Sequence, residues 1–283
     1  LSFAIDAHRA RTAAALSWRD GYAEYLSYVL YLPLYLAGPI VSFDSFVAQR
    51  RAATAAAKAA DSPLRAGYVA RLLAAAVLLD ALSHRFHGFA LARSGAYRSF
   101  GAADACVFGY WLLLLVYLKF FVIWRGFRLW AALDGVDAPE NLPSCISVHH
   151  SLASFWRSWH ASFNQWLVRY LYVPLGGRAA RWRNLALCFA FVALWHDATL
   201  KLLLWGALLP AGFAPELAAT AAAARYPARW SHPGYRHLVA LGGAATIGVL
   251  VAANLVGFGV DAPGGAGVAM RLVATSEGAA VLG

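Results

Sequence analysis

A run of almost unbroken apolar residues, Ala105–Trp124, sets the first limit on what this chain folds into. Arg125 and Arg128 close the run on its C-terminal side. About 20 apolar residues in helical form are long enough to cross a bilayer. A helix that is apolar on every side suits lipid or a large protein interior rather than a water-facing surface. The run therefore predicts a transmembrane helix.

Further apolar runs predict that the chain crosses the membrane several times. Hydrophobic residues make up 61% and charged residues 13% of the sequence, whereas soluble domains have roughly 45–50% and about 25%. We therefore expect an all-α polytopic membrane protein. The stretch 218–224, which is low-complexity alanine, predicts a helix, and Gly264–Gly283 is too weakly patterned to assign. The other candidate spans are Tyr22–Val41 (interrupted by Pro33 and Pro39) and Gly67–Leu82, and further apolar stretches are Leu185–Trp195, Leu200–Phe213 and His237–Gly257.

The formal net charge of +10 comes almost entirely from arginine. These arginines are scattered between apolar runs, so we expect them to face anionic lipid headgroups and not nucleic acid, which requires a basic patch on one face. Three cysteines, an odd and small number, predict no disulfide framework. The sequence begins at Leu1 without a signal-peptide pattern, so we expect a fragment that lacks an N-terminal part.

The segment 133–184 differs from the rest because it mixes Asp, Pro, His, Arg and Trp. We expect it to form an interfacial or re-entrant region. Helical spacing within Ser154–Gly177 places Arg157, His160 and Asn164 on one polar face. The polar face either stays wet on a helix lying in the interface or lines a tunnel inside the membrane. An aromatic stripe covers the other face: Phe155, Trp159, Phe163, Trp166 and Tyr170.

A second polar cluster interrupts apolar sequence at His196 and Asp197. An ionisable side chain at the bilayer centre costs about 2.5–3.5 kcal/mol on insertion scales, so it needs a partner or a wet cavity. Asp197 and Lys201 are four residues apart and would pair along one helix face. His196 has no such local partner, which leaves open a structural histidine or a functional one.

Two histidines in an apolar tunnel are suited to acyl transfer. A neutral imidazole removes the proton of a hydroxyl that attacks a thioester, and burial keeps the imidazole neutral. The second polar group orients the acceptor or stabilises the oxyanion. A metal site is the competing chemistry, but no carboxylate-rich or Cys-paired spacing supports zinc, and we predict none. Its ligands would come from His149, His150, His160 and His196.

Three motifs, in order, resemble the membrane-bound O-acyltransferase family. They are Tyr31–Ile40 (YLPLYLAGPI), Trp156–Gly177 and Leu194-Trp195-His196. The resemblance covers about Tyr22 to Phe258 and is strongest to the glycerol uptake protein branch, which is related to Hedgehog acyltransferase. It implies a helical bundle that encloses a tunnel, with residues 1–283 forming one transmembrane domain.

The resemblance assigns roles to single residues. It implies that His196 is the catalytic base and His160 the second catalytic group. A cysteine in a similar context carries haem through its thiolate in Hedgehog acyltransferase, which implies such a role for Cys145; a free loop cysteine is the alternative. Substrate contacts in the tunnel fall on Arg157, Asn164, Asp197, Trp156 and Trp195.

The implied reaction moves a long-chain fatty acyl group from acyl-CoA to a lipid-linked hydroxyl. The resemblance further implies remodelling of glycosylphosphatidylinositol (GPI) anchor lipids in the endoplasmic reticulum membrane, with membrane lipids, acyl-CoA and a lipid or lipid-anchored acceptor as partners. A glycerol/proton symporter is the first alternative, but it predicts inverted repeats that we do not find. The second is an inactive regulator of protein lipidation, against which the presence of both histidines speaks.

Overall fold

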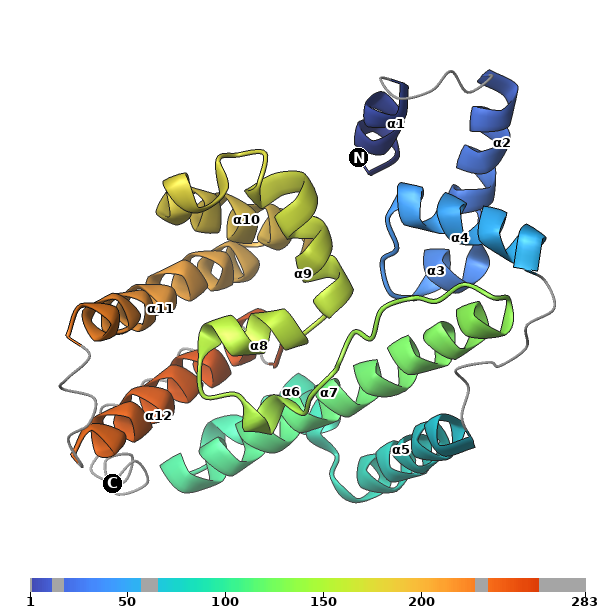
Figure 1. The fold of residues 1–283 in the computed structure, drawn as a ribbon. Helices are drawn as coiled ribbons and strands as arrows, with labels where there is room; N and C mark the ends of the chain where they lie inside the picture. Colours follow the sequence, from blue (N-terminus) through green and yellow to red (C-terminus); the bar gives the residue numbers. More distant parts are fainter. Residues whose placement is uncertain (1, 12–17, 57–65, 227–233, 260–283) are drawn as a thin grey trace. The chain divides into compact units, whose positions relative to one another are not determined.

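The computed structural model describes residues 2–11, 18–56, 66–226 and 234–259. Within these ranges the chain is all-α, with no strand, as the sequence predicts (Figure 1). Gly264–Gly283 lies outside them. The helices are α1 (Ser2–Arg11), α2 (Trp18–Val29), α3 (Leu32–Leu36), α4 (Phe43–Ala56), α5 (Ala66–Arg85), α6 (Gly88–Ser94), α7 (Ala102–Leu133), α8 (Leu152–Ser158), α9 (Ala161–Leu167), α10 (Arg181–His196), α11 (Leu200–Arg225) and α12 (Tyr235–Asn254).

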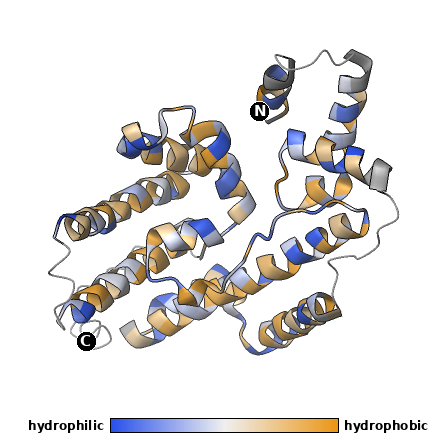
Figure 2. Cartoon of the chain, in the orientation of Figure 1, coloured by the Kyte–Doolittle hydropathy of each residue, from blue (hydrophilic) through white to orange (hydrophobic). Residues whose placement is uncertain are grey.

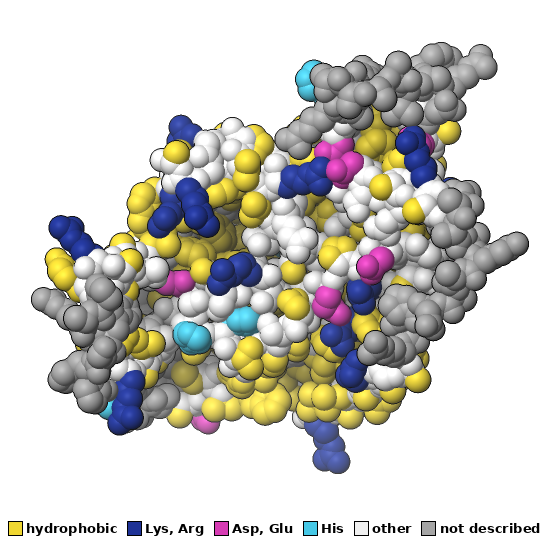
Figure 3. Space-filling view, in the orientation of Figure 1, with side chains coloured by type: hydrophobic (Ala, Val, Ile, Leu, Met, Phe, Trp, Pro, Cys, Tyr) yellow, Lys and Arg dark blue, Asp and Glu magenta, His cyan; other side chains and the backbone are white. Residues whose placement is uncertain are grey.

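Four helices in the described part of the chain are long and apolar enough to cross a membrane: α5, α7, α11 and α12. Large apolar side chains of α5 are exposed, among them Leu73 (60%), Val77 (70%) and Leu78 (50%). Hydrophobic colours run along most of this helix (Figure 2), and hydrophobic side chains reach the surface over broad areas (Figure 3). Such surface is unfavourable in water and suits hydrocarbon. The prediction of a polytopic membrane protein is confirmed.

One predicted span and one predicted apolar stretch do not form spanning helices. Tyr22–Val41 is divided between α2 and the five-residue α3. Pro33 is the second residue of α3, and Gly38 lies so close to the carbonyl of Pro33 that a Cβ there would be 2.3 Å from that oxygen. The second, Leu185–Trp195, falls within α10, which has 16 residues and is not among the four. A helix of this length rises only about 24 Å, less than the hydrocarbon core.

The α11 helix is longer than the predicted run Leu200–Phe213 and includes the alanine-rich stretch that was expected to be helical. Pro210 and Pro215 lie inside it. Proline is tolerated within membrane helices because neighbouring groups satisfy the freed backbone carbonyls. The α7 helix likewise extends beyond its apolar run at both ends.

The chain divides into two compact units, which are described separately. Unit 1 consists of Leu1–Asp80, Leu118–Ser144 and Arg157–Leu175; unit 2 consists of Ala81–Tyr117, Cys145–Trp156 and Gly176–Gly283. The core of unit 1 forms where the first motif and the start of α4 meet the end of α7 and the loop after it. Its buried residues are Val41, Phe46, Ala131, Val136 and Ala138.

Unit 2 is built on α10, α11 and α12. The α10 and α11 helices lie side by side (Figure 1), and Gly206 permits their close approach. A Cβ at Gly206 would be 3.0 Å from Cβ of Ala193 and 3.1 Å from the carbonyl oxygen of Phe189. Small residues allow membrane helices to pack at such short distances. The pairing positions the C-terminal end of α10, where His196 lies.

The segment from Ser154 to Val173, predicted to be one amphipathic helix that ends before Pro174, is not continuous. The segment forms α8, then a break at Trp159-His160, then α9, then the π-helical turn Val168–Tyr172. The break separates Arg157 from Asn164, so the polar face predicted from helical spacing does not form. Helical elements within 133–180 have at most seven residues each. The expectation that region 133–184 is interfacial or re-entrant stays a prediction.

Candidate functional site

His196 is the last residue of α10 and packs against aromatic rings of unit 2. Its ring centroid lies 4.9 Å from Phe258 and 6.1 Å from Trp205, both edge-on. Trp195 contributes a further ring at 4.9 Å. The helix ends here because Asp197 is extended, with φ −178° and ψ 148°. His196 therefore lies at a helix terminus, next to rings from three segments.

Trp205 lies at the centre of a ring cluster in unit 2, whose members are Trp156, Phe189, His196, Trp205 and Phe258. It is 1% exposed, and its Nε1 donates to Oδ1 of Asn254 at 3.4 Å. Gly257 packs directly on the indole, because a Cβ there would lie 2.9 Å from Trp205 Cδ1. A ring in such contact has little freedom to shift, since protein interiors are close-packed. The position of His196 is thus set by packing.

The imidazole of His196 reaches the surface of unit 2. The surrounding protein nevertheless lowers its pKa below the usual 6.5, because burial disfavours the charged form. The neutral imidazole is the form that accepts a proton. This state matches the requirement for a general base.

Trp156, predicted to contact substrate, belongs to the same ring cluster. Its indole lies 5.3 Å from Phe189 and 5.7 Å from Trp205, edge-on to both. Its Nε1 is buried and has no hydrogen-bond partner among the described residues. Glu216 of α11 holds the start of α8, which carries Trp156. Its carboxylate accepts the backbone N–H groups of Leu152 at 2.7 Å and of Ala153 at 3.3 Å.

Trp195 and Asp197, also predicted to contact substrate, are both exposed. The predicted pairing of Asp197 with Lys201 along one helix face is wrong. The helix ends at His196, and Lys201 belongs to α11, which begins at Leu200. Sequence spacing of four residues has its helical meaning only within an unbroken helix.

His160 lies in unit 1, at the break between α8 and α9. Its φ of 47° and ψ of 52° are left-handed, and it is the one non-glycine residue with positive φ among the described residues. This conformation costs an L-residue about 1–2 kcal/mol. Strained backbone in folded proteins clusters at functional sites. The imidazole stacks on Trp124, with centroids 4.5 Å apart at 24°.

Arg157 and Asn164 flank His160 on different helices. Arg157 is exposed near the end of α8, and Asn164 is partly buried in α9, where its N–H donates to the carbonyl of His160 at 3.1 Å. His160 and His196 belong to different units. Their convergence on one substrate therefore stays a prediction, as do the tunnel and the substrate contacts.

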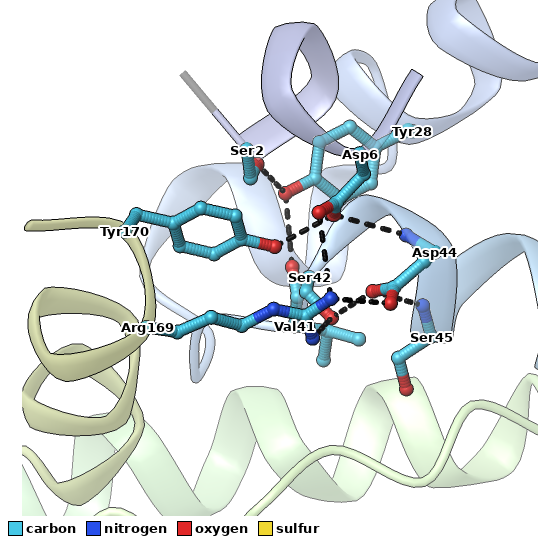
Figure 4. Close-up of polar contacts among 9 residues, drawn as sticks. All are labelled: Ser2, Asp6, Tyr28, Val41, Ser42, Asp44, Ser45, Arg169 and Tyr170. Carbon is cyan, nitrogen blue, oxygen red and sulfur yellow. Dashed lines mark hydrogen bonds and ion pairs between the residues drawn. The ribbon is translucent and has the colours of Figure 1, made fainter. Parts of the chain in front are cut away.

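A polar network in unit 1 was missed from the sequence. Tyr170, in the π-helical turn, donates to Asp6 Oδ2 at 2.6 Å (Figure 4). The neighbouring Arg169 lies 3.4 Å from Asp6 and 2.5 Å from Asp44. A π-turn adds one residue to the helix and frequently occurs at functional sites. No spacing in the sequence connects positions 6, 44 and 169, so pattern reasoning had no signal for this network.

The network shifts the pKa of its members. Burial alone would raise the pKa of Asp44, but hydrogen bonds from Arg169, Ser42 and the Ser45 backbone outweigh burial and lower it. The pKa of Tyr170 is raised, first by burial and then by its bond to Asp6. Asp44 therefore remains ionised and paired under ordinary conditions.

The predicted haem ligand, Cys145, is an exposed free cysteine. It precedes the short turn Ile146–Val148 on an irregular segment. An exposed thiol gives no support for a haem thiolate at this position. Among the described residues, no group of three or more His, Cys, Asp or Glu side chains gathers as metal ligands would.

Comparison with known proteins gives one family. The sequence pattern of the membrane-bound O-acyltransferase family matches residues 6–256. The chain is 38% identical over 258 residues to the "Membrane-bound O-acyltransferase GUP1" of Saccharomyces cerevisiae, covering 90% of this chain and 45% of that protein. It is 36% identical over 255 residues to the gup1 protein of Schizosaccharomyces pombe, covering 90% of this chain and 43% of that one.

A more distant relative carries a different activity in its name. The mouse "Protein-cysteine N-palmitoyltransferase HHAT" is 30% identical over 265 residues, covering 88% of this chain and 52% of that protein. The chain spans about half the length of the curated relatives it matches. The match extends over the early motif, His160 and His196. This chain belongs to the membrane-bound O-acyltransferase family.

Proposed function

We propose that the protein containing this chain transfers a long-chain fatty acyl group from acyl-CoA to a lipid-linked hydroxyl in the endoplasmic reticulum membrane, with GPI-anchor lipids as the acceptor class. The observation that carries the proposal is His196, a neutral imidazole at a helix end within the ring cluster of unit 2. Family membership supports acyl transfer. The O-acyltransferases are more similar to this chain than the N-palmitoyltransferase, which supports a hydroxyl acceptor.

In the proposed reaction, His196 accepts the proton of the acceptor hydroxyl as its oxygen attacks the thioester carbonyl carbon. The C–S bond then breaks, the new ester forms, and the departing CoA sulfur takes the proton from the imidazolium. His160 orients the acceptor or stabilises the developing oxyanion. Arg157, Asn164 and Trp156 would contact substrate, as would the exposed Trp195 and Asp197.

The test is His196→Ala in the full-length protein, expressed in membranes. We expect transfer from labelled palmitoyl-CoA to a lysophosphatidylinositol acceptor to be lost, with expression unchanged, because no other group replaces the base. His237→Ala removes an exposed imidazole of unit 2 outside the ring cluster and should retain activity. Full activity of His196→Ala would end the assignment.

Two further arms define the substrate and the pH dependence. An N-terminal cysteine peptide as acceptor should give no product, and glycerol should not cross sealed vesicles without acyl-CoA; glycerol flux with no acyl transfer would instead support the symporter. Because the pKa of His196 lies below 6.5, the base stays neutral at mildly acid pH. The acid limb of the rate profile should therefore fall below pH 6.5.

A further inference from the structure

The first turn of α9 lacks the cap that its own N-cap residue would ordinarily supply. The first N–H groups of a helix have no partner within the helix, and a side chain at the N-cap position commonly accepts one of them. His160 occupies that position and makes no side-chain cap hydrogen bond. The α9 helix is nevertheless capped, because another residue of unit 1 performs this role.

That residue is Asn141, which accepts two N–H groups at the start of α9. Its backbone carbonyl accepts from Ala161 at 3.1 Å, and its side-chain Oδ1 accepts from Ser162 at 3.0 Å. Ser162 in turn accepts the N–H of Ile40, in the first motif, through Oγ at 2.8 Å. Three segments distant in sequence thus meet directly after His160.

These bonds lie out of reach of solvent. Asn141 is 0% exposed and Ser162 is 2% exposed. When a buried hydrogen bond loses one partner, water does not replace it, and the remaining group stays unsatisfied. The Nδ2 of Asn141 is itself buried without a partner among the described residues. At this buried position Asn141 therefore forms these hydrogen bonds through its two oxygens.

The arrangement has a consequence for the imidazole. A side chain that caps its own helix folds back toward the backbone, so it does not project away to stack on another ring. Asn141 takes over the cap, and the His160 side chain lies on Trp124 while its backbone stays at φ 47°. The hydrogen bonds that follow His160 oppose relaxation of this conformation.

We propose that Asn141 is the positioning residue of His160: it caps α9 from the preceding loop and thereby fixes the left-handed backbone that aims the imidazole. The proposal rests on the proposed function, in which His160 acts on the substrate. Asn141 does not touch substrate and acts through His160. Loss of its Oδ1 should slow the chemical step and leave substrate binding unchanged.

The experiment compares three variants in the purified full-length protein, with labelled palmitoyl-CoA and lysophosphatidylinositol. Asn141→Leu keeps the branched shape of the side chain and removes Oδ1, whereas Asn141→Asp keeps a side-chain oxygen that accepts the N–H of Ser162. Gln49→Leu is the matched control, because Gln49 also exchanges two hydrogen bonds with a loop backbone, that of Asp137, at 2.7 and 3.2 Å. This loop also carries Asn141, but Gln49 has no bond to α9.

We expect kcat of Asn141→Leu to fall by about 10- to 100-fold with KM unchanged, since misplacement of a catalytic group by about 1 Å has an effect of this size. Asn141→Asp should restore most of kcat, and Gln49→Leu should keep it. If Asn141→Leu does not fold, Asn141→Gln, whose amide oxygen is displaced by one methylene, replaces it with the same expectation. Unchanged kcat, a rise in KM alone, or equal loss in the Gln49 variant would overturn the proposal.

A second readout does not depend on turnover. In a background without native cysteines, His160→Cys is labelled with a maleimide and followed by peptide mass spectrometry. Asn141→Leu should speed labelling at position 160, and Gln49→Leu should not. If the wild type transfers no acyl group but this pattern holds, the proposed function fails and the role of Asn141 stands. Equal labelling rates in all backgrounds would overturn the role of Asn141 itself.

Discussion

His160 and His196 are held in place by different forces. In unit 1, His160 has a strained backbone that directional hydrogen bonds secure, with Asn141 at their centre. In unit 2, His196 ends a regular helix, packs against aromatic rings and also reaches the surface. A hydrogen bond fails when one atom moves, whereas ring packing is the sum of many weak contacts. Unit 1 should therefore be sensitive to single polar atoms and unit 2 to changes of volume.

The largest expected effect tests packing in unit 2. Gly257→Ala places a methyl group 2.9 Å from Trp205 Cδ1, and the buried indole has no room to move. Overpacking of this kind destabilises by about 1–3 kcal/mol. Gly248→Ala in α12 is the control, because nothing lies within 4 Å of its Cβ. Thermal unfolding of the detergent-solubilised full-length protein should show a lower Tm for Gly257→Ala only; equal Tm values would mean that packing does not fix Trp205.

The next effect tests the backbone of unit 1. His160→Val puts a β-branched residue at φ 47°, where it is a severe outlier, while His160→Asn suits the left-handed region. Both variants lose the imidazole, so their difference isolates the backbone. We expect Val to be less stable than Asn by about 1–2 kcal/mol in the same unfolding assay. The reverse order would show that His160 does not hold a left-handed conformation in the protein.

The smallest effect concerns the pH dependence of the Asp44 pair. Its lowered pKa means that ionised Asp44 stabilises the folded state above its usual pKa of 3.8, and that this stability is lost as pH falls through the lowered value. Asp44 and Arg169 are 49% and 40% exposed, so the pair contributes at most about 1 kcal/mol. Asp44→Asn should lower Tm at neutral pH, and the difference should vanish well below pH 3.8. A difference that grows toward acid pH would contradict this sign.

Apolar runs in the sequence were enough to predict the four long membrane helices. A continuous apolar run such as 105–124 has no polar face to turn toward water, so hydropathy alone predicts helices such as α7 and α12. Their ends were less predictable, because α11 continues through Pro210 and Pro215. Pro33, Gly38 and Pro39 were visible in the sequence, but they break a helix locally in a way that mean hydropathy does not register.

The candidate site was predictable in residue identity and not in geometry. The motifs identified His160 and His196, but periodicity joined Arg157, His160 and Asn164 on one helix face that does not exist. A left-handed histidine cannot be read from residue spacing, because its stability comes from a distant asparagine. Asn141 and Asp6 act through tertiary hydrogen bonds, and no local pattern marks such residues.

Two hydrogen bonds to Glu216 link the start of α8 to α11 within unit 2. The α11 helix is long enough to span a bilayer, whereas α8 is a short helix that carries Trp156. Helices adjust their tilt when hydrocarbon thickness changes. A tilt of α11 would displace the first turn of α8. A change in lipid thickness would therefore shift Trp156, whose ring packs against Trp205.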